Sequence, residues 1–147
     1  MRRSLRGYYA LDGGTLIELC LETGAGKALR DELKSGDVFA YTHDMALMEL
    51  LYILCRKYGW QRAMRSTESL MLSGFLTVEA ASALSEDASR MKCSRPLALS
   101  DCLTLALATR KGMTALFASR EAELVREMER EPLGVDVEFI SDWHNGA

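Results

Sequence analysis

The chain has few of the residues that mark disulfide-stabilised, zinc-binding or fibrous proteins. Its 147 residues include only two prolines, four cysteines and two histidines. So little proline excludes collagen-like and proline-rich disordered chains. The cysteines form no Cys-x-x-Cys pair, and neither histidine lies at zinc-finger spacing from them. We therefore expect reduced thiols that pack as small apolar groups, at Cys20, Cys55, Cys93 and Cys102.

Long uncharged apolar runs are also absent. None reaches the roughly 18 to 20 residues that a membrane-spanning helix needs. The N-terminus carries basic residues, but Asp12 interrupts the apolar segment that a signal peptide would require. We therefore expect a cytoplasmic protein without a membrane partner. With 18 basic and 21 acidic residues the net charge is −3, so any contact with nucleic acid must use a local basic patch.

What the sequence does contain is an alternation of strand-like and helix-like apolar segments. Hydrophobic residues make up 48% and charged residues 27%, which is typical of one soluble domain that buries a core. We expect a single domain over residues 1–147, with its core at about 8–140 and a loose tail at 141–147. The patterns predict strands at 7–11, 37–41, 75–78, 113–118 and 134–140, and helices at 15–21, 27–34, 42–58, 60–72, 79–92, 99–111 and 119–130. Strands separated by helices predict an α/β fold with a mostly parallel sheet of four to five strands, covered on both faces.

Three acidic residues each stand alone in an apolar segment. Asp12 is the only charged residue in 7–17, Glu49 the only one in 45–55, and Asp101 the only one in 96–109. Removing a carboxylate from water costs several kcal/mol unless it is paired, hydrogen-bonded or neutralised. No basic side chain lies within one helical turn of Glu49 or Asp101. Local ion pairs therefore do not explain these acids.

Two interpretations of the three acids compete. Each acid either caps a helix or meets a distant arginine; capping suits Asp12 and Asp101, which lie near helix starts, but not Glu49, a full turn inside its helix. Alternatively the three converge at the carboxyl ends of the strands, where ligands gather in parallel α/β sheets. Converging carboxylates repel one another unless a divalent cation lies among them, and oxygen ligands favour Mg²⁺ or Mn²⁺.

Four segments in order carry a resemblance to a known family. They are Tyr9–Asp12 with Leu16–Leu19, the apolar helix around Glu49, the Ala/Leu-rich segment 97–108 around Asp101, and segment 114–121. Together they resemble the PIN-domain family of metal-dependent ribonucleases, which includes the VapC-type toxins, over roughly residues 8–140. The resemblance implies a three-layer α/β/α PIN-like fold and hydrolysis of RNA phosphodiester bonds with one or two Mg²⁺ or Mn²⁺ ions. It implies the catalytic, metal-binding set Asp12, Glu49, Asp101 and Glu121, and it also implies a homodimer and, for a toxin of a toxin–antitoxin pair, an antitoxin partner.

The sequence departs from the family pattern at two places. The family usually has a small hydroxyl residue two positions after the first Asp, where this chain has Gly14, with Thr15 next to it. The family often has an Asp after the fourth strand, where this chain has Arg120, with Glu121 alongside. Glu121 could reach the metal directly or through water, whereas Arg120 could weaken the fourth ligand or bind phosphate. The second departure motivates an alternative function: a catalytically weak or inactive PIN-like scaffold that binds RNA or protein.

Substrate contacts and other chemistry leave weaker signals. RNA drawn to an acidic site needs basic residues at its rim, and the candidates are Arg90, Lys92, Arg95 and Arg120. His43 is expected at a helix entrance with no visible partner to orient it as a general base. A receiver-like regulatory domain is a further alternative, but it would want a second acid beside Asp12, where Gly13 stands.

Overall fold

Five strands form one parallel sheet at the centre of the molecule. The computed structural model describes residues 6–145, with side chains described as far as Asp142. The strand order is β3-β2-β1-β4-β5, and every neighbouring pair is parallel. The strands are β1 (Gly7–Leu11), β2 (Val38–His43), β3 (Leu76–Glu79), β4 (Thr114–Phe117) and β5 (Val137–Phe139). The predicted parallel α/β fold is therefore confirmed, with the last strand at an edge as expected.

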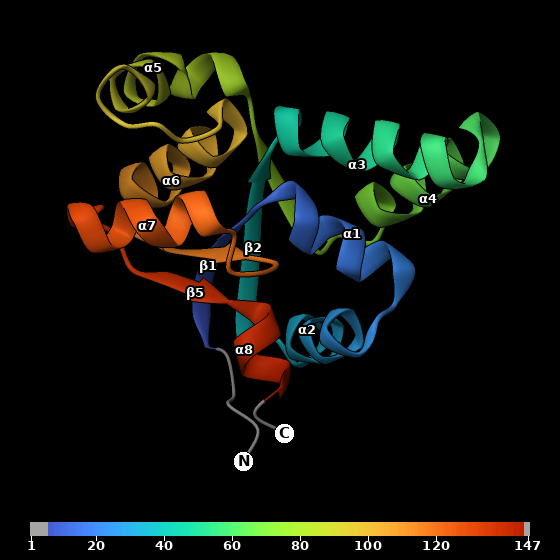
Figure 1. The fold of residues 1–147 in the computed structure, drawn as a ribbon. Coiled ribbons are helices and arrows are strands. Elements are labelled where there is room, and N and C mark those ends of the chain that lie inside the picture. The colour runs from blue at the N-terminus through green and yellow to red at the C-terminus, as the bar shows by residue number, and fades with distance from the viewer. Residues whose placement is uncertain (1–5, 146–147) are drawn as a thin grey trace.

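Helices cover both faces of this sheet, which makes the predicted three layers. Figure 1 shows α1 to α4 and α8 on one side of the strands and α5 to α7 on the other. The helices are α1 (Gly13–Leu21), α2 (Gly24–Ser35), α3 (Asp44–Tyr58), α4 (Trp60–Leu72), the 3-10 helix η1 (Ala81–Leu84), α5 (Ser85–Ser94), α6 (Leu99–Lys111), α7 (Ala122–Arg130) and α8 (Ile140–Asn145). Among the residues described, no helix combines the length and the apolar character needed to cross a bilayer.

The two helical layers produce two cores, one on each face of the sheet. Successive side chains of a strand point to opposite faces. Leu11 and Leu116 accordingly pack with α1 to α4, whereas Ala10 and Phe117 pack with α5 to α7. Both faces of the central strands are buried, which explains their continuous apolar character. The strand ends are thereby held in fixed positions.

Two helices begin earlier than the sequence patterns predict, because side chains cap them. Asp12 accepts a hydrogen bond from the Thr15 backbone nitrogen, so α1 begins at Gly13 rather than at Thr15. Thr23 caps α2 in the same way, so the helix begins at Gly24 rather than at Lys27. A side-chain acceptor at the N-cap satisfies a free backbone N–H of the first turn, and here it outweighs the low helix propensity of glycine.

Other boundaries differ because tertiary pairing overrides local pattern. The predicted helix at 79–92 is replaced by the end of β3 at Glu79, then η1, then α5, because Glu79 pairs with His43 of β2. Ile140–Asn145 form α8, which packs against α2, whereas we predicted a loose tail over 141–147, of which 146–147 lie outside the described residues. The thiols are free, and Cys102 is buried, but Cys93 is exposed rather than packed as predicted.

Candidate metal centre

Four acidic residues reach the same edge of the sheet from four different elements. Asp12 directly follows β1, and Glu49 lies in the second turn of α3, which begins where β2 ends. Asp101 lies in the first turn of α6, and Glu121 follows β4, immediately before α7. Because all strands are parallel, their carboxyl ends share one edge, which is where α/β proteins place their ligands. Figure 1 shows the first turns of α1, α3 and α6 around this edge.

The four carboxylates lie within electrostatic reach of one another. Burial raises the pKa of Asp101 to about 7, and the negative charges of Glu121, Asp12 and Glu49 add to the effect. Burial also raises the pKa of Asp12 to about 6, against hydrogen bonds from Thr15 that lower it. The pKa of Glu49 is raised by burial and by Glu121. The structure therefore brings together all four acids that the sequence singled out.

None of the four acids has a basic partner in the part of the chain that the structure describes. No lysine or arginine of residues 6–142 forms an ion pair with Asp12, Glu49, Asp101 or Glu121. No cation contributes to the raised pKa values of Asp12, Glu49 and Asp101 either. The interpretation in which each acid meets its own arginine is thus wrong. Asp12 does cap α1, and it also lies near the other acids, so both interpretations apply to that residue.

Two glycines allow the elements to approach closely at the site. A Cβ atom on Gly13 would lie 2.9 Å from Oε1 of Glu49, a distance that real Cβ atoms essentially never show. A Cβ atom on Gly14 would lie 2.9 Å from the Cβ of Ala118, which follows β4. The pair Gly13–Gly14, which lies outside the helix predicted at 15–21, therefore belongs to the first turn of α1 and packs directly against Glu49 and Ala118.

Two hydroxyl side chains hold the carboxylates. The Thr15 hydroxyl donates to Oδ1 of Asp12 at 2.7 Å, and Thr15 is fully buried. Ser100 of α6 lies near the Glu49 carboxylate and lowers its pKa, which favours the ionised form. Thr15 was visible in the sequence as the hydroxyl beside Gly14. Ser100 was missed, because adjacency to Asp101 on the chain says nothing about contact with α3.

Arg120 and Glu121, which follow β4, have different surroundings in the structure. Arg120 pairs with Asp142 of α8 at 2.6 Å, and its guanidinium lies 4.7 Å from the ring centroid of Phe139. Glu121 is exposed, and its charge raises the pKa values of the other three acids. Glu121 is thus the neighbour whose charge acts on the cluster. Glu123, two residues further along in the first turn of α7, also raises the pKa of Asp101 and was missed in the sequence.

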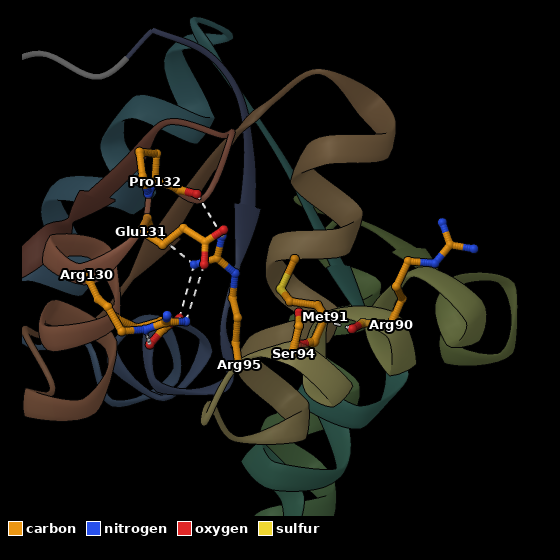
Figure 2. Close-up of polar contacts among 8 residues, drawn as sticks. Arg90, Met91, Ser94, Arg95, Arg130, Glu131 and Pro132 are labelled. Atoms are coloured by element: carbon orange, nitrogen blue, oxygen red, sulfur yellow. Dashed lines mark hydrogen bonds and ion pairs between the residues drawn. The ribbon is translucent and has the colours of Figure 1, made fainter.

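The other three basic candidates differ in exposure. Arg90 is exposed and pairs only with Glu86, while Lys92 is exposed and donates to the Leu97 carbonyl. Arg95 is only 12% exposed in its side chain and pairs with Glu127 of α7. Figure 2 shows Arg95 reaching across to Glu131 and Pro132, whose carbonyls it also binds, while Arg90 points the other way. This geometry favours a structural role for Arg95 over contact with RNA.

His43 lies at the entrance of α3, where we expected it, and it is fully buried. Its Nδ1 accepts from the Ala46 backbone nitrogen, which makes His43 the N-cap of the helix. Burial lowers the pKa of His43 to about 4, so the ring is neutral at neutral pH. A buried ring occupied by two internal hydrogen bonds acts as a structural group and not as a general base for solvent or substrate.

The donor set fits a hard divalent cation in its chemistry. All four candidate ligands are carboxylates, with no thiolate or imidazole among them, which is the oxygen set that Mg²⁺ and Mn²⁺ prefer. Desolvation and the charges of neighbouring acids raise the pKa values of Asp12, Glu49 and Asp101, and a bound cation would offset both effects. Within the described residues, no three His, Cys, Asp or Glu side chains already stand as a preformed metal-binding group.

Comparison with solved structures shows the same fold in other proteins. A VapBC2 complex of Rickettsia felis, bound to a DNA fragment from its promoter, matches with a TM-score of 0.63 and 14% identity, over 90% of this chain and 98% of that one. A DNA-bound VapBC complex of Salmonella typhimurium matches with a TM-score of 0.63 and 19% identity, over 90% and 98% of the two chains. The sarcin-ricin loop cleaving toxin VapC20 of Mycobacterium tuberculosis matches with a TM-score of 0.58 and 23% identity, over 73% and 86%.

Sequence comparison gives the family directly. No curated protein sequence matches this chain. The model of the PIN domain, however, matches residues 9–127, which include the segments around Asp12, Glu49, Asp101 and Glu121. The match covers most of the 147 residues and agrees with the parallel sheet and its acidic edge. The chain therefore belongs to the PIN-domain family.

Proposed function

We propose that this protein is a metal-dependent endoribonuclease that hydrolyses RNA phosphodiester bonds. The observation that carries the proposal is the convergence of Asp12, Glu49, Asp101 and Glu121 at one sheet edge without a basic partner among the described residues. Such an arrangement costs folding free energy, because desolvated like charges repel. The cost is explained if the acids bind a divalent cation that the reaction needs.

The residues have distinct roles in this proposal. Asp12, Glu49 and Asp101 would hold the cation, and Glu121, the most exposed of the four, would bind it directly or through water. When bound, Mg²⁺ or Mn²⁺ supplies the activation of water and the neutralisation of charge on the phosphate. Thr15 keeps Asp12 in place, and its hydrogen bonds favour the ionised carboxylate that a cation requires.

The substrate would approach over exposed basic residues. Arg90 and Lys92 lie on α5, the element that precedes the Asp101 helix, and both are exposed. Contacts to phosphate position RNA without reading its sequence, and they weaken as salt increases. Arg120, which is 57% exposed in its side chain, could exchange its pair with Asp142 for a phosphate.

A cleavage assay tests the proposal. The purified protein is incubated with structured and single-stranded RNA in Mn²⁺ or in EDTA. We expect cleavage in Mn²⁺ that EDTA abolishes and that Asp101→Asn reduces by about a hundredfold or more, since removal of one charge-stabilising group commonly costs 10²–10³ in kcat. Glu68→Gln, an exposed residue of α4, is the matched charge control. Cleavage unchanged in EDTA and in Asp101→Asn would reject the proposal.

The alternative scaffold function is distinguished by metal binding. We considered a scaffold because Arg120 stands where the family often has its fourth acid. Arg120, however, pairs with Asp142, and Glu121 is the residue whose negative charge raises the pKa of Asp101. This contact weakens the case for an inactive scaffold. Calorimetric titration with Mn²⁺ decides between the two: measurable binding that Asp101→Asn removes supports the nuclease, and no binding by the wild-type protein supports the scaffold.

We also propose an antitoxin partner and a homodimer. The proposal of an antitoxin is supported by the structural similarity to the two VapBC complexes. The proposal of a homodimer is supported by large apolar side chains left exposed on α3, namely Met48 at 57% and Tyr52 at 46%. Light scattering after size exclusion measures the oligomeric state of the wild-type protein and of Met48→Glu. A monomeric wild type would exclude the dimer.

A further inference from the structure

Buried polar side chains are concentrated behind the acidic site. Among the described residues, five polar or charged side chains are buried, and four of them hydrogen-bond next to the acids; they are Thr15, Thr42, His43 and Thr104. The Thr42 hydroxyl donates to the carbonyl of Leu11, the residue before Asp12, at 2.9 Å. The Thr15 hydroxyl reaches both Asp12 and the Leu116 carbonyl at the end of β4. The remainder of the core is almost entirely apolar.

His43 and Thr104 link the helix of Glu49 to the helix of Asp101. Nδ1 of His43 accepts from Ala46 at 3.1 Å, so in the neutral ring the proton lies on Nε2. Nε2 then donates to the Thr104 hydroxyl at 2.9 Å, and that hydroxyl donates to the Ser100 carbonyl at 3.2 Å. Each donor in this chain has one acceptor, so a single tautomer satisfies all the groups.

The hydrogen bonds end at Ser100, the residue before Asp101. They run from the first turn of α3, through His43 and Thr104, to the Ser100 carbonyl in the first turn of α6. The Ser100 side chain also lies near the Glu49 carboxylate, whose pKa it lowers. Replacing two hydrogen-bonded groups by apolar ones is often neutral for stability, so packing alone does not call for polar residues here.

We propose that His43 and Thr104 are positioning residues, which fix the separation of Glu49 and Asp101 so that both carboxylates bind the same divalent cation. The inference rests on the proposed function. The physical reason is that repelling carboxylates move apart unless their helices are held, and His43, Thr104 and Ser100 tie the two helix starts together. His43 touches neither the cation nor the substrate in this role.

Three variants separate this role from simple structural damage. Thr104→Val keeps the shape of the side chain but removes the hydroxyl that links His43 to Ser100. His43→Asn keeps an acceptor that caps α3 but is too short to reach Thr104. The double variant His43→Asn, Thr104→Val removes both partners of the His43–Thr104 hydrogen bond, so no imidazole N–H is left without its acceptor as it is in Thr104→Val alone.

Two further variants are controls. Thr104→Ser retains the linking hydroxyl and should restore wild-type behaviour. Thr109→Val removes the same type of hydrogen bond within α6, from Thr109 to the Leu105 carbonyl, on an exposed residue that does not contact His43. This control measures how far a threonine-to-valine change elsewhere in α6 alters stability, Mn²⁺ affinity and cleavage.

The experiment measures Mn²⁺ affinity by calorimetry and RNA cleavage at saturating Mn²⁺, with thermal unfolding as a check of folding. We expect Thr104→Val and the double variant to weaken Mn²⁺ binding by about tenfold or more, the range typical of groups that orient metal ligands. We also expect kcat to fall while KM for RNA stays unchanged, because exposed basic residues bind RNA. Thr104→Ser and Thr109→Val should match the wild type.

The outcomes distinguish this inference from the proposed function. Folded Thr104→Val and double variants that bind Mn²⁺ and cleave RNA as the wild type does would overturn the positioning role alone. Equal losses in Thr109→Val and Thr104→Val would overturn it as well, since the effect would then be general to α6. A wild-type protein that binds no Mn²⁺ would refute the proposed function and, with it, this inference.

Discussion

Replacing Asp101 by asparagine is expected to stabilise the metal-free protein at neutral pH. The pKa of Asp101 rises from 3.8 to about 7 in the folded state, chiefly through burial and then through Glu121, Asp12 and Glu49. A rise of about three pKa units at ~1.4 kcal/mol per unit gives an upper bound of roughly 4 kcal/mol of folding free energy. Asp101 is half-buried, so solvent screening reduces the effect, and we expect a gain of about 1–2 kcal/mol.

The pH dependence of this gain follows from the direction of the shift. Because the folded-state pKa of Asp101 lies above the unfolded value, the protonated carboxyl contributes stability that is complete below about pH 3.8 and is lost as pH rises through about 7. The stability difference between Asp101→Asn and wild type should therefore be less than half as large at about pH 5 as at about pH 8. Urea unfolding in EDTA at both pH values measures it, with Glu68→Gln as the control.

The same variant should lose its response to metal. Added Mn²⁺ is expected to stabilise the wild type by about 2.7 kcal/mol at a hundred times the dissociation constant. Asp101→Asn lacks one of the ligands and should show little of this gain. If Asp101→Asn is less stable than wild type in EDTA at pH 8, mutual repulsion of the carboxylates does not describe this site and the reasoning is refuted.

Three further predictions concern individual contacts. Gly13→Ala should weaken Mn²⁺ binding by about tenfold, because the new Cβ displaces the Glu49 carboxylate, and calorimetry would show unchanged affinity if that contact is unimportant. Thr15→Val should lower Mn²⁺ affinity, because the pKa of Asp12, about 6, rises further without the hydroxyl. The loss of affinity relative to wild type should be greatest at low pH. A loss of equal size at every pH would contradict this explanation. Arg95→Ala should lower the Tm more than Arg90→Ala, because Arg95 joins the α5–α6 loop to α7 whereas Arg90 forms a surface pair; equal Tm values would argue against this role.

The sequence was sufficient to predict the fold and the acids for a definite physical reason. Asp12, Glu49 and Asp101 stand out because a lone carboxylate in an apolar segment is expensive to bury, and a parallel sheet collects the ends of its strands at one edge. The first signal can be read from neighbouring residues on the chain, and the second follows from the order of strands and helices. Neither requires knowledge of a contact between distant residues.

Contacts between distant elements could not be predicted in this way. Ser100 and Thr104 are ordinary helix residues in the sequence, and only the packing of α6 against β2 brings them near His43 and Glu49. Arg95 looked like an exposed basic residue, yet its partner Glu127 lies 32 positions away on α7. We missed the helix starts at Gly13 and Gly24 because glycine has a low helix propensity, whereas here the caps Asp12 and Thr23 stabilise helical first turns that contain glycine.

The central claim is that bound divalent metal, as one ion or two, holds the carboxylates of Asp12, Glu49 and Asp101 together. Anomalous diffraction from a crystal soaked in Mn²⁺ tests it most directly. We expect a single strong peak, or two adjacent peaks, within about 2.2 Å of oxygens from these three residues. A crystal with ordered side chains, no peak at this edge of the sheet and each carboxylate turned toward solvent would contradict the account.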